Sequence, residues 1–315
     1  MGKKDEYQFT YLDDDFRFAD QINGALFGGE QVVKAQELEP AETQVIYTGT
    51  DGHRKAIADK ARMWKGQELH IFAIENQNYV DYRMVLRTML SESIGYHKQW
   101  RQKKRDHERT KDLEGRDAFL SGMEKDERFV PIITLVVYYG GDRAWDGAVC
   151  LHDMLTVEEK LKAYITNYRL NLYDCHAHDS FEEYHSGLRQ VFETLRYAKD
   201  KEMLRRIMEE NRDAYSRLDS ETRRMLEVTA KVRIPEDCRV MVNGEERFDM
   251  CKAFEDMRLE GKLEGKLEGE ESKLAEQTGK KLSKGKSIAV IAEELEETEE
   301  RIRELIQKYR LAAEC

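Results

Sequence analysis

Hydrophobic residues recur at every fourth position over residues 14–27 and predict an amphipathic helix. Phe18, Ile22 and Leu26 would form its apolar stripe, because a helix of about 3.6 residues per turn presents such positions on one face. The aspartates at 13–15 offer oxygens that can cap the first backbone amides, and the glycine pair after the helix can end it. The pattern therefore predicts a helix near the start of the chain.

Alternating and continuous apolar runs then predict strands around one long helix. Residues 55–64 and 69–75 have the pattern of two strands joined by the short segment KGQE, as in a β-meander. Residues 79–105 have helical periodicity, and residues 130–140 are nearly all apolar and rich in Val and Ile, as in a strand covered on both faces. The order helix, strands, helix, strand predicts an α/β core.

The remainder of the chain is predicted to be helical. Residues 155–233 have a helical pattern and contain no proline. The repeat LEGK-LEGK-LEGE (259–270) places a leucine every four residues, slightly more than one helical turn, so its apolar stripe drifts. Residues 288–295 and 297–309 predict two short helices with a helix-turn-helix rhythm. The many acidic residues favour packing or oligomerisation over DNA reading for this hairpin.

Composition favours a soluble, helix-rich protein. The chain has 315 residues, 40% of them hydrophobic and 37% charged, with a net charge of −11 and three prolines. The five cysteines are scattered and never spaced as CxxC, which argues against a disulfide framework or a zinc cluster. The longest apolar run is too short to cross a bilayer as a helix, so we expect a cytoplasmic protein without a membrane partner.

Two carboxylates fall on the predicted strand pair and raise the question of a metal site. Asp59 lies in the first strand and Glu75 at the end of the second, and Gln77 shares a strand face with Glu75. Hard oxygen ligands of this kind suit Mg²⁺ or Mn²⁺, although acids at strand ends are more often simply solvated. Gln77 could orient a water molecule but cannot carry a positive charge.

A basic segment at residues 97–111 is the best phosphate-binding candidate in this acidic chain. It holds seven Lys or Arg residues against two acids, although cations also suit the C-terminal end of a helix through its dipole. Tyr82 and Tyr96, on the preceding helical stretch, are expected to be core residues with hydroxyls at the rim rather than platforms for stacked bases.

Several of these stretches together resemble one known family. An acid on one strand followed by Glu-x-Gln at the end of the next is similar to the PD-(D/E)XK nuclease superfamily. The likeness is closer to its recombination-promoting nuclease (Rpn)/putative transposase family. It extends over residues 17–33, 74–99 and 130–155 and over the Glu-Gly repeats that lead into the terminal hairpin. The resemblance therefore covers most of the chain.

The resemblance implies a restriction-endonuclease-like core, a mixed sheet flanked by helices, followed by a helical domain and a helical tail. On this basis the chain is expected to divide into a nuclease-like domain (1–155), a helical domain (156–255) and a tail that carries the repeat and the hairpin (256–315). A homo-oligomer formed through the C-terminal helices is a further possibility.

The resemblance also implies roles for individual residues. Asp59 and Glu75 would bind the divalent metal, and Gln77 would stand where the superfamily has a lysine. The first helix of the superfamily often contributes another acid, for which Asp20 is the candidate, while Asp14 and Asp15 could equally be helix caps. No proline precedes Asp59, and the neutral Gln77 departs from the superfamily pattern.

The resulting hypothesis is an endonuclease that uses Mg²⁺ or Mn²⁺ to hydrolyse backbone phosphodiesters of DNA with low sequence preference, linked to recombination or mobile elements. Arg87 could hold a phosphate or the Glu75 carboxylate itself. The residues expected to contact DNA are Arg87, Lys98, Arg101, Lys103, Lys104 and Arg105. The alternative is a catalytically weak DNA-binding or assembly protein that keeps the nuclease fold.

Overall fold

The structure is a computed structural model that describes residues 3–41, 44–49, 52–57, 60–66, 69–140 and 143–311. Its residue contacts group the chain into two compact units, Met1–Met250 and Cys251–Cys315, and the division of the chain into three domains stays a prediction. We describe each unit by itself.

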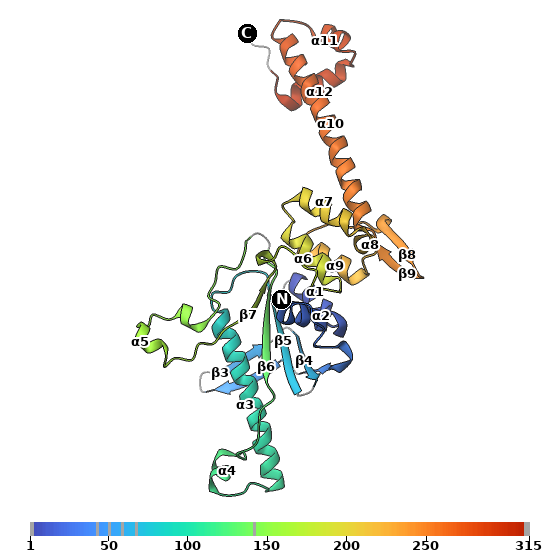
Figure 1. The fold of residues 1–315 in the computed structure, drawn as a ribbon. Helices are drawn as coiled ribbons and strands as arrows, with labels where there is room; N and C mark the ends of the chain where they lie inside the picture. The colour runs from blue at the N-terminus through green and yellow to red at the C-terminus, as the bar shows by residue number, and fades with distance from the viewer. Residues whose placement is uncertain are drawn as a thin grey trace. The chain divides into compact units, whose positions relative to one another are not determined.

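A five-stranded mixed sheet forms the centre of the first unit (Figure 1). Its strands lie in the order β1 (Leu38–Pro40), β4 (Lys60–Lys65), β5 (Leu69–Gln77), β6 (Ile132–Tyr138) and β7 (Asn171–Asp174). Neighbours from β1 to β5 are antiparallel, and those from β5 to β7 are parallel. With helices on both sides, this arrangement confirms the expected α/β fold class.

Helices flank this sheet on both faces. Helix α1 (Lys3–Tyr11) and helix α2 (Asp15–Phe27) lie on the face where β4 presents Arg62, whose Nε donates a hydrogen bond of 2.7 Å to Asp15. Helix α3 (Met84–Thr110) runs beside β6 on the other face, where Gly95 brings its backbone close to the side chain of Ile132 (Figure 1). A methyl group at Gly95 would lie 2.5 Å from the end of the isoleucine side chain, so a larger residue here would require that side chain to shift.

Helix α2 and strand β6 form as their sequences predict. Asp14 caps α2 by accepting a hydrogen bond of 2.9 Å from the backbone N–H of Arg17, and Gly28 ends the helix in the left-handed conformation with φ of 59°. In β6 the residues from Thr134 to Tyr138 are all buried, because helices cover both faces of this strand.

The predicted strand 55–64 is wrong in detail, because two different strands occupy it. Residues Gly52–Ile57 form β3, which pairs with β2 (Gln44–Gly49) in a separate two-stranded sheet, whereas β4 belongs to the main sheet. An apolar pattern of period two does not reveal which partner a strand takes, so the break was not predicted.

The long helix begins and ends later than expected, and the buried strand is shorter than expected. Helix α3 covers Met84–Thr110 instead of 79–105, and β6 covers Ile132–Tyr138 instead of 130–140. The start of α3 is set by Asp81, whose carboxylate accepts a hydrogen bond from the backbone N–H of Arg83, the residue before the helix. Because this contact involves polar groups, the pattern of hydrophobic residues does not reveal where the helix begins.

The prediction of a helical segment over 155–233 is also corrected. Residues Asn171–Asp174 form β7, the edge strand of the main sheet. The remaining helices of this unit are α4 (Arg116–Ser121), α5 (Glu159–Lys162), α6 (Leu188–Arg196), α7 (Lys201–Glu210), α8 (Arg212–Tyr215) and α9 (Ser220–Thr229), with 3-10 turns at Ala35–Glu37, Leu151–Met154, Cys175–Ala177 and Glu236–Cys238. A strand of four residues is too short to stand out from its helical surroundings.

A β-hairpin near the end of the first unit was missed. Strands β8 (Arg239–Val242) and β9 (Glu245–Phe248) pair through Asn243 and Gly244, whose φ values are 51° and 83°. Positive φ at both central residues is characteristic of the turn that Asn-Gly favours, so the dipeptide was the available signal.

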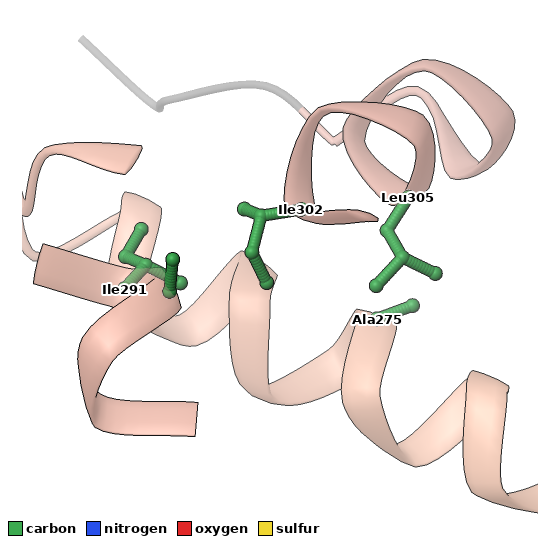
Figure 2. Packing of buried hydrophobic residues seen from close by; sticks show 5 residues of the cluster. Ala275, Ile291, Ile302 and Leu305 are labelled. Carbon is green, nitrogen blue, oxygen red and sulfur yellow. The ribbon is translucent and has the colours of Figure 1, made fainter. Parts of the chain in front are cut away.

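The second unit is a helical hairpin packed on a long helix. The long helix is α10 (Met250–Leu282), and the hairpin consists of α11 (Ile288–Leu295) and α12 (Glu299–Tyr309). Ala275 of α10 forms one buried cluster with Ile291 of α11 and with Ile302 and Leu305 of α12 (Figure 2). These burials support packing as a role of the hairpin. The repeat lies in α10, and its leucines, Leu259, Leu263 and Leu267, are each more than half exposed. No helix within the described residues has the length and apolarity needed to cross a membrane.

Candidate functional site

The candidate site lies where strand β5 ends beside the parallel strand β6. Glu75 and Gln77 project from the same face of β5, and each residue is only 5% exposed. They pair in register with Val136 and Tyr138 of β6. Ligands of sheets with parallel strands commonly bind outside the carboxyl ends of the strands, so this edge is a suitable place for chemistry.

An arginine compensates the buried charge of Glu75. Arg87, in the first turn of α3, donates from Nη2 to Oε2 of Glu75 at 3.2 Å. It also donates from Nη1 to Oδ2 of Asp81 at 2.9 Å. A buried carboxylate without such a partner would be strongly destabilising, so Arg87 makes the position of Glu75 tolerable. The sequence left open whether Arg87 holds a phosphate or the Glu75 carboxylate, and in the structure it contacts Glu75.

Asp81 is a second buried acid that the sequence did not single out. Its residue is 5% exposed, and its carboxylate accepts hydrogen bonds from Arg83 at the backbone N–H (2.9 Å), Nε (3.2 Å) and Nη2 (3.3 Å). The signal was present as Asp-Tyr-Arg, in which an acid precedes an arginine by two residues just before a helix.

These ion pairs keep the site charged. Burial acts to raise the pKa of Asp81, but hydrogen bonds from Arg83 and Arg87 outweigh it and hold the pKa below its usual value of 3.8. Burial likewise acts to lower the pKa of Arg87, and the contacts with Asp81 and Glu75 outweigh it, so the pKa of Arg87 is raised. The guanidinium therefore remains a fixed cation at neutral pH.

The predicted metal site combines residues inside and outside the described part of the chain. Asp59 lies outside the described residues. Within the described part of the chain, no group of three or more His, Cys, Asp or Glu side chains is arranged to hold a metal ion. A magnesium site can nevertheless be built on one or two protein carboxylates with water and phosphate oxygens, and the buried carboxylate of Glu75 fits one such position.

Asp20 is buried in a different environment from the one expected. Its carboxylate accepts hydrogen bonds from the backbone N–H groups of His185 (2.9 and 3.1 Å) and Ser186 (2.8 Å) and from the Ser186 hydroxyl (2.6 Å). These bonds attach α2 to the turn that precedes α6 and give Asp20 a structural role. Asp14 caps α2, as the alternative proposed, while Asp15 pairs with Arg62.

The basic segment is only partly available to a ligand. Arg101 and Arg105 are exposed, whereas Lys98, Lys103 and Lys104 are partly buried. Lys103 donates to Glu127 at 3.0 Å, so it helps to attach the segment that follows α4 to the end of α3. The segment thus combines the two alternatives considered for it, a structural helix end and a surface with exposed cations.

His107 completes this attachment. Its ring nitrogens lie 2.6 Å from Asp112 Oδ1 and 3.0 Å from Glu127 Oε2. The hydrogen bond with Asp112 and then that with Glu127 raise the pKa of His107 above its usual value of 6.5. Burial acts to raise the pKa of Glu127, but hydrogen bonds led by that from Lys103 outweigh it and bring the pKa to about 2.

Tyr82 is not the core residue that its helical spacing predicted. It lies just before α3 and is 60% exposed, and its neighbour Tyr79 is 65% exposed. The prediction was wrong because α3 begins two residues later, so Tyr82 belongs to the loop that leaves β5. Tyr96, in contrast, is inside α3 and accepts a hydrogen bond of 3.0 Å from the backbone N–H of Ile132.

Comparison with known proteins gives one family. A family model described as "Putative transposase, YhgA-like" matches residues 60–224, slightly more than half of the chain. The match includes β4, β5, α3 and β6 and thus Glu75, Gln77 and Arg87. Among curated proteins and solved structures, no match to the chain was found.

Replacing Asp20 with Asn should destabilise the fold. The variant loses the charge of an acceptor that holds three polar hydrogens of His185 and Ser186, at a cost of about 1–3 kcal/mol in the free energy of unfolding measured with urea. Asp213→Asn is the control, because the Asp213 side chain is 94% exposed. Weaker Mn²⁺ binding with unchanged stability would instead assign Asp20 to a metal site.

The attachment at His107 should depend on pH. Since its folded pKa is raised above 6.5, its stabilising contribution is complete below that value and is lost as pH rises through the folded pKa. An NMR titration of the full chain should give a His107 pKa above 6.5, reduced in Glu127→Gln and unchanged in Glu114→Gln. A pKa at or below 6.5 in the unmodified protein would contradict the structure.

Proposed function

We propose that this chain, which belongs to the YhgA-like putative transposase family, is a metal-dependent DNA endonuclease that hydrolyses backbone phosphodiesters. The family match confirms the resemblance noted in the sequence and supports a nuclease-like role linked to mobile DNA. Nuclease activity, its dependence on Mg²⁺ or Mn²⁺ and DNA as the substrate are our proposals.

The observation that carries the proposal is the buried carboxylate of Glu75 at the end of β5. A carboxylate that is 7% exposed and held by Arg87 is expensive to maintain, and packing alone would be served better by an apolar side chain. Glu75 and Asp59 would hold the metal, which when bound can lower the pKa of a water molecule and neutralise charge on a phosphate.

In this proposal Gln77 and Arg87 together replace the superfamily lysine, with Gln77 orienting the water molecule and Arg87 supplying the positive charge. Gln77 lies on the same strand face as Glu75, so its amide can orient a water molecule or a phosphate oxygen, but it is neutral. Arg87 supplies a fixed positive charge 3.2 Å from Glu75. A preformed cation beside the reacting phosphate stabilises the charge that develops in the transition state.

A second candidate function is a catalytically weak DNA-binding or assembly protein that retains the nuclease fold. The observation in its favour is that Arg87 forms ion pairs with both Glu75 and Asp81, so the negative charges of these two acids are already compensated without a metal ion. The packed hairpin of the second unit is also compatible with assembly.

Replacing Glu75 with Gln should strongly reduce the rate of DNA cleavage while leaving the folded structure largely unchanged. The amide has the same shape but removes a hard anionic ligand, so we expect the nicking rate of supercoiled plasmid in Mg²⁺ or Mn²⁺ to fall by at least about 100-fold. Glu159→Gln is the matched control, because the Glu159 side chain is 84% exposed on α5. Cleavage should continue at the normal rate in that variant.

The same assay separates the two candidate functions. A protein that never nicks plasmid with either ion, or that nicks equally well as Glu75→Gln, is not the proposed enzyme. Plasmid binding without nicking, unchanged in Glu75→Gln, would identify the DNA-binding alternative.

A further inference from the structure

Two large aromatic side chains lie exposed in the loop that follows the strand carrying Glu75 and Gln77. Tyr79 and Tyr82 are 65% and 60% exposed and belong to the short loop between β5 and α3. Tyr79 follows Gln77 by two residues. Aromatic rings this exposed add little to the core, so their position beside the buried acid calls for another explanation.

A second loop contributes to the same edge of the sheet. The segment that follows β6 contacts the tyrosine loop where Gly147 meets Val80, since a methyl group at Gly147 would lie 3.0 Å from that valine. The same segment presents Arg143, whose pKa is raised first by its hydrogen bond with Tyr82. Tyr79 and Tyr82 therefore belong to the edge of the sheet formed by the segments that follow β5 and β6, residues 78–83 and 143–147, which we call the lip.

The charges of this lip are balanced. Arg83 bonds to Asp81, and Arg143 lies 2.8 Å from Asp146. Arg83 and Arg143 are the exposed arginines among the described residues of the lip, and each has an acidic partner. These residues therefore do not present the uncompensated positive field that binds the two phosphate backbones of a duplex. What the lip offers instead is two exposed tyrosine rings, one of which, Tyr82, is hydrogen-bonded to Arg143.

Aromatic faces of this kind suit bases that have left the double helix. Stacking of a base on an aromatic side chain contributes about 1–3 kcal/mol and requires no particular base, whereas paired bases in a duplex keep their faces covered. The guanidinium groups of Arg83 and Arg143 can still donate to a single backbone phosphate, because their side chains are 75% and 61% exposed.

We propose that Tyr79 and Tyr82 form a stacking surface for unpaired nucleotides, so that the substrate of this site is single-stranded or locally unpaired DNA. The inference rests on the proposed nuclease function and specifies its substrate class. The tyrosines position the strand, while Glu75 and its neighbours act on the phosphate. Binding through stacking also predicts a smaller dependence on salt than binding through the exposed cations of α3, because the salt dependence grows with the number of phosphates that cations neutralise.

The test compares binding of a fluorescein-labelled single strand with binding of its duplex. Fluorescence anisotropy of the full chain in Ca²⁺ should show tighter binding of the single strand. The double variant Tyr79→Leu/Tyr82→Leu should weaken that binding roughly 10-fold, the loss expected when stacking is replaced by aliphatic contact. The control is Tyr164→Leu, because Tyr164 is 86% exposed next to α5 and should leave binding unchanged.

The outcomes distinguish this inference from the function on which it rests. Equal or tighter binding of the duplex, or unchanged single-strand binding in the double variant, overturns the stacking surface even if plasmid is nicked. Loss of single-strand binding in the double variant, together with full binding in Glu75→Gln, supports the stacking surface. That support holds even if cleavage is never detected, in which case only the nuclease proposal fails.

Discussion

The ion pair between Glu75 and Arg87 is the interaction on which the rest of the site depends. A carboxylate that is 7% exposed at the end of a central strand loses most of its hydration, and the guanidinium 3.2 Å away replaces it. Removing the arginine would leave an uncompensated charge at a cost of about 3 kcal/mol, reduced because the Arg87 side chain is 39% exposed. The pair therefore joins the first turn of α3 to the end of β5.

That constraint organises the neighbouring elements. Asp81 accepts from both Arg83 and Arg87, which holds the loop between β5 and α3 in one conformation. Farther along, Gly95 lets α3 approach β6 so that the helix covers the face of the sheet that carries Glu75. The loop must then turn outward between strand and helix, and this turn exposes Tyr79 and Tyr82 at the edge of the site.

Local patterns were sufficient to predict only part of this structure. Helix α2 and strand β6 were predictable because capping residues and apolar periodicity act within a few positions. The division of 55–64 into two strands and the sheet position of β7 depend on partners distant in the chain. The same is true of Asp20, whose hydrogen-bond partner His185 is 165 residues away. The resemblance to a family predicts roles for Glu75 and Gln77, whereas the burial of Asp81 and its contacts with two arginines are seen in the folded chain.

The most direct test of the central claim is a crystal structure of the protein grown with Mn²⁺ and examined by anomalous scattering at the manganese edge. The account predicts an anomalous peak at coordination distance, about 2.0–2.2 Å, from a carboxylate oxygen of Glu75, and none there in Glu75→Gln crystals. A fully occupied Mn²⁺ elsewhere in the first unit, with no ion at Glu75 and the Glu75–Arg87 contact intact, would contradict it.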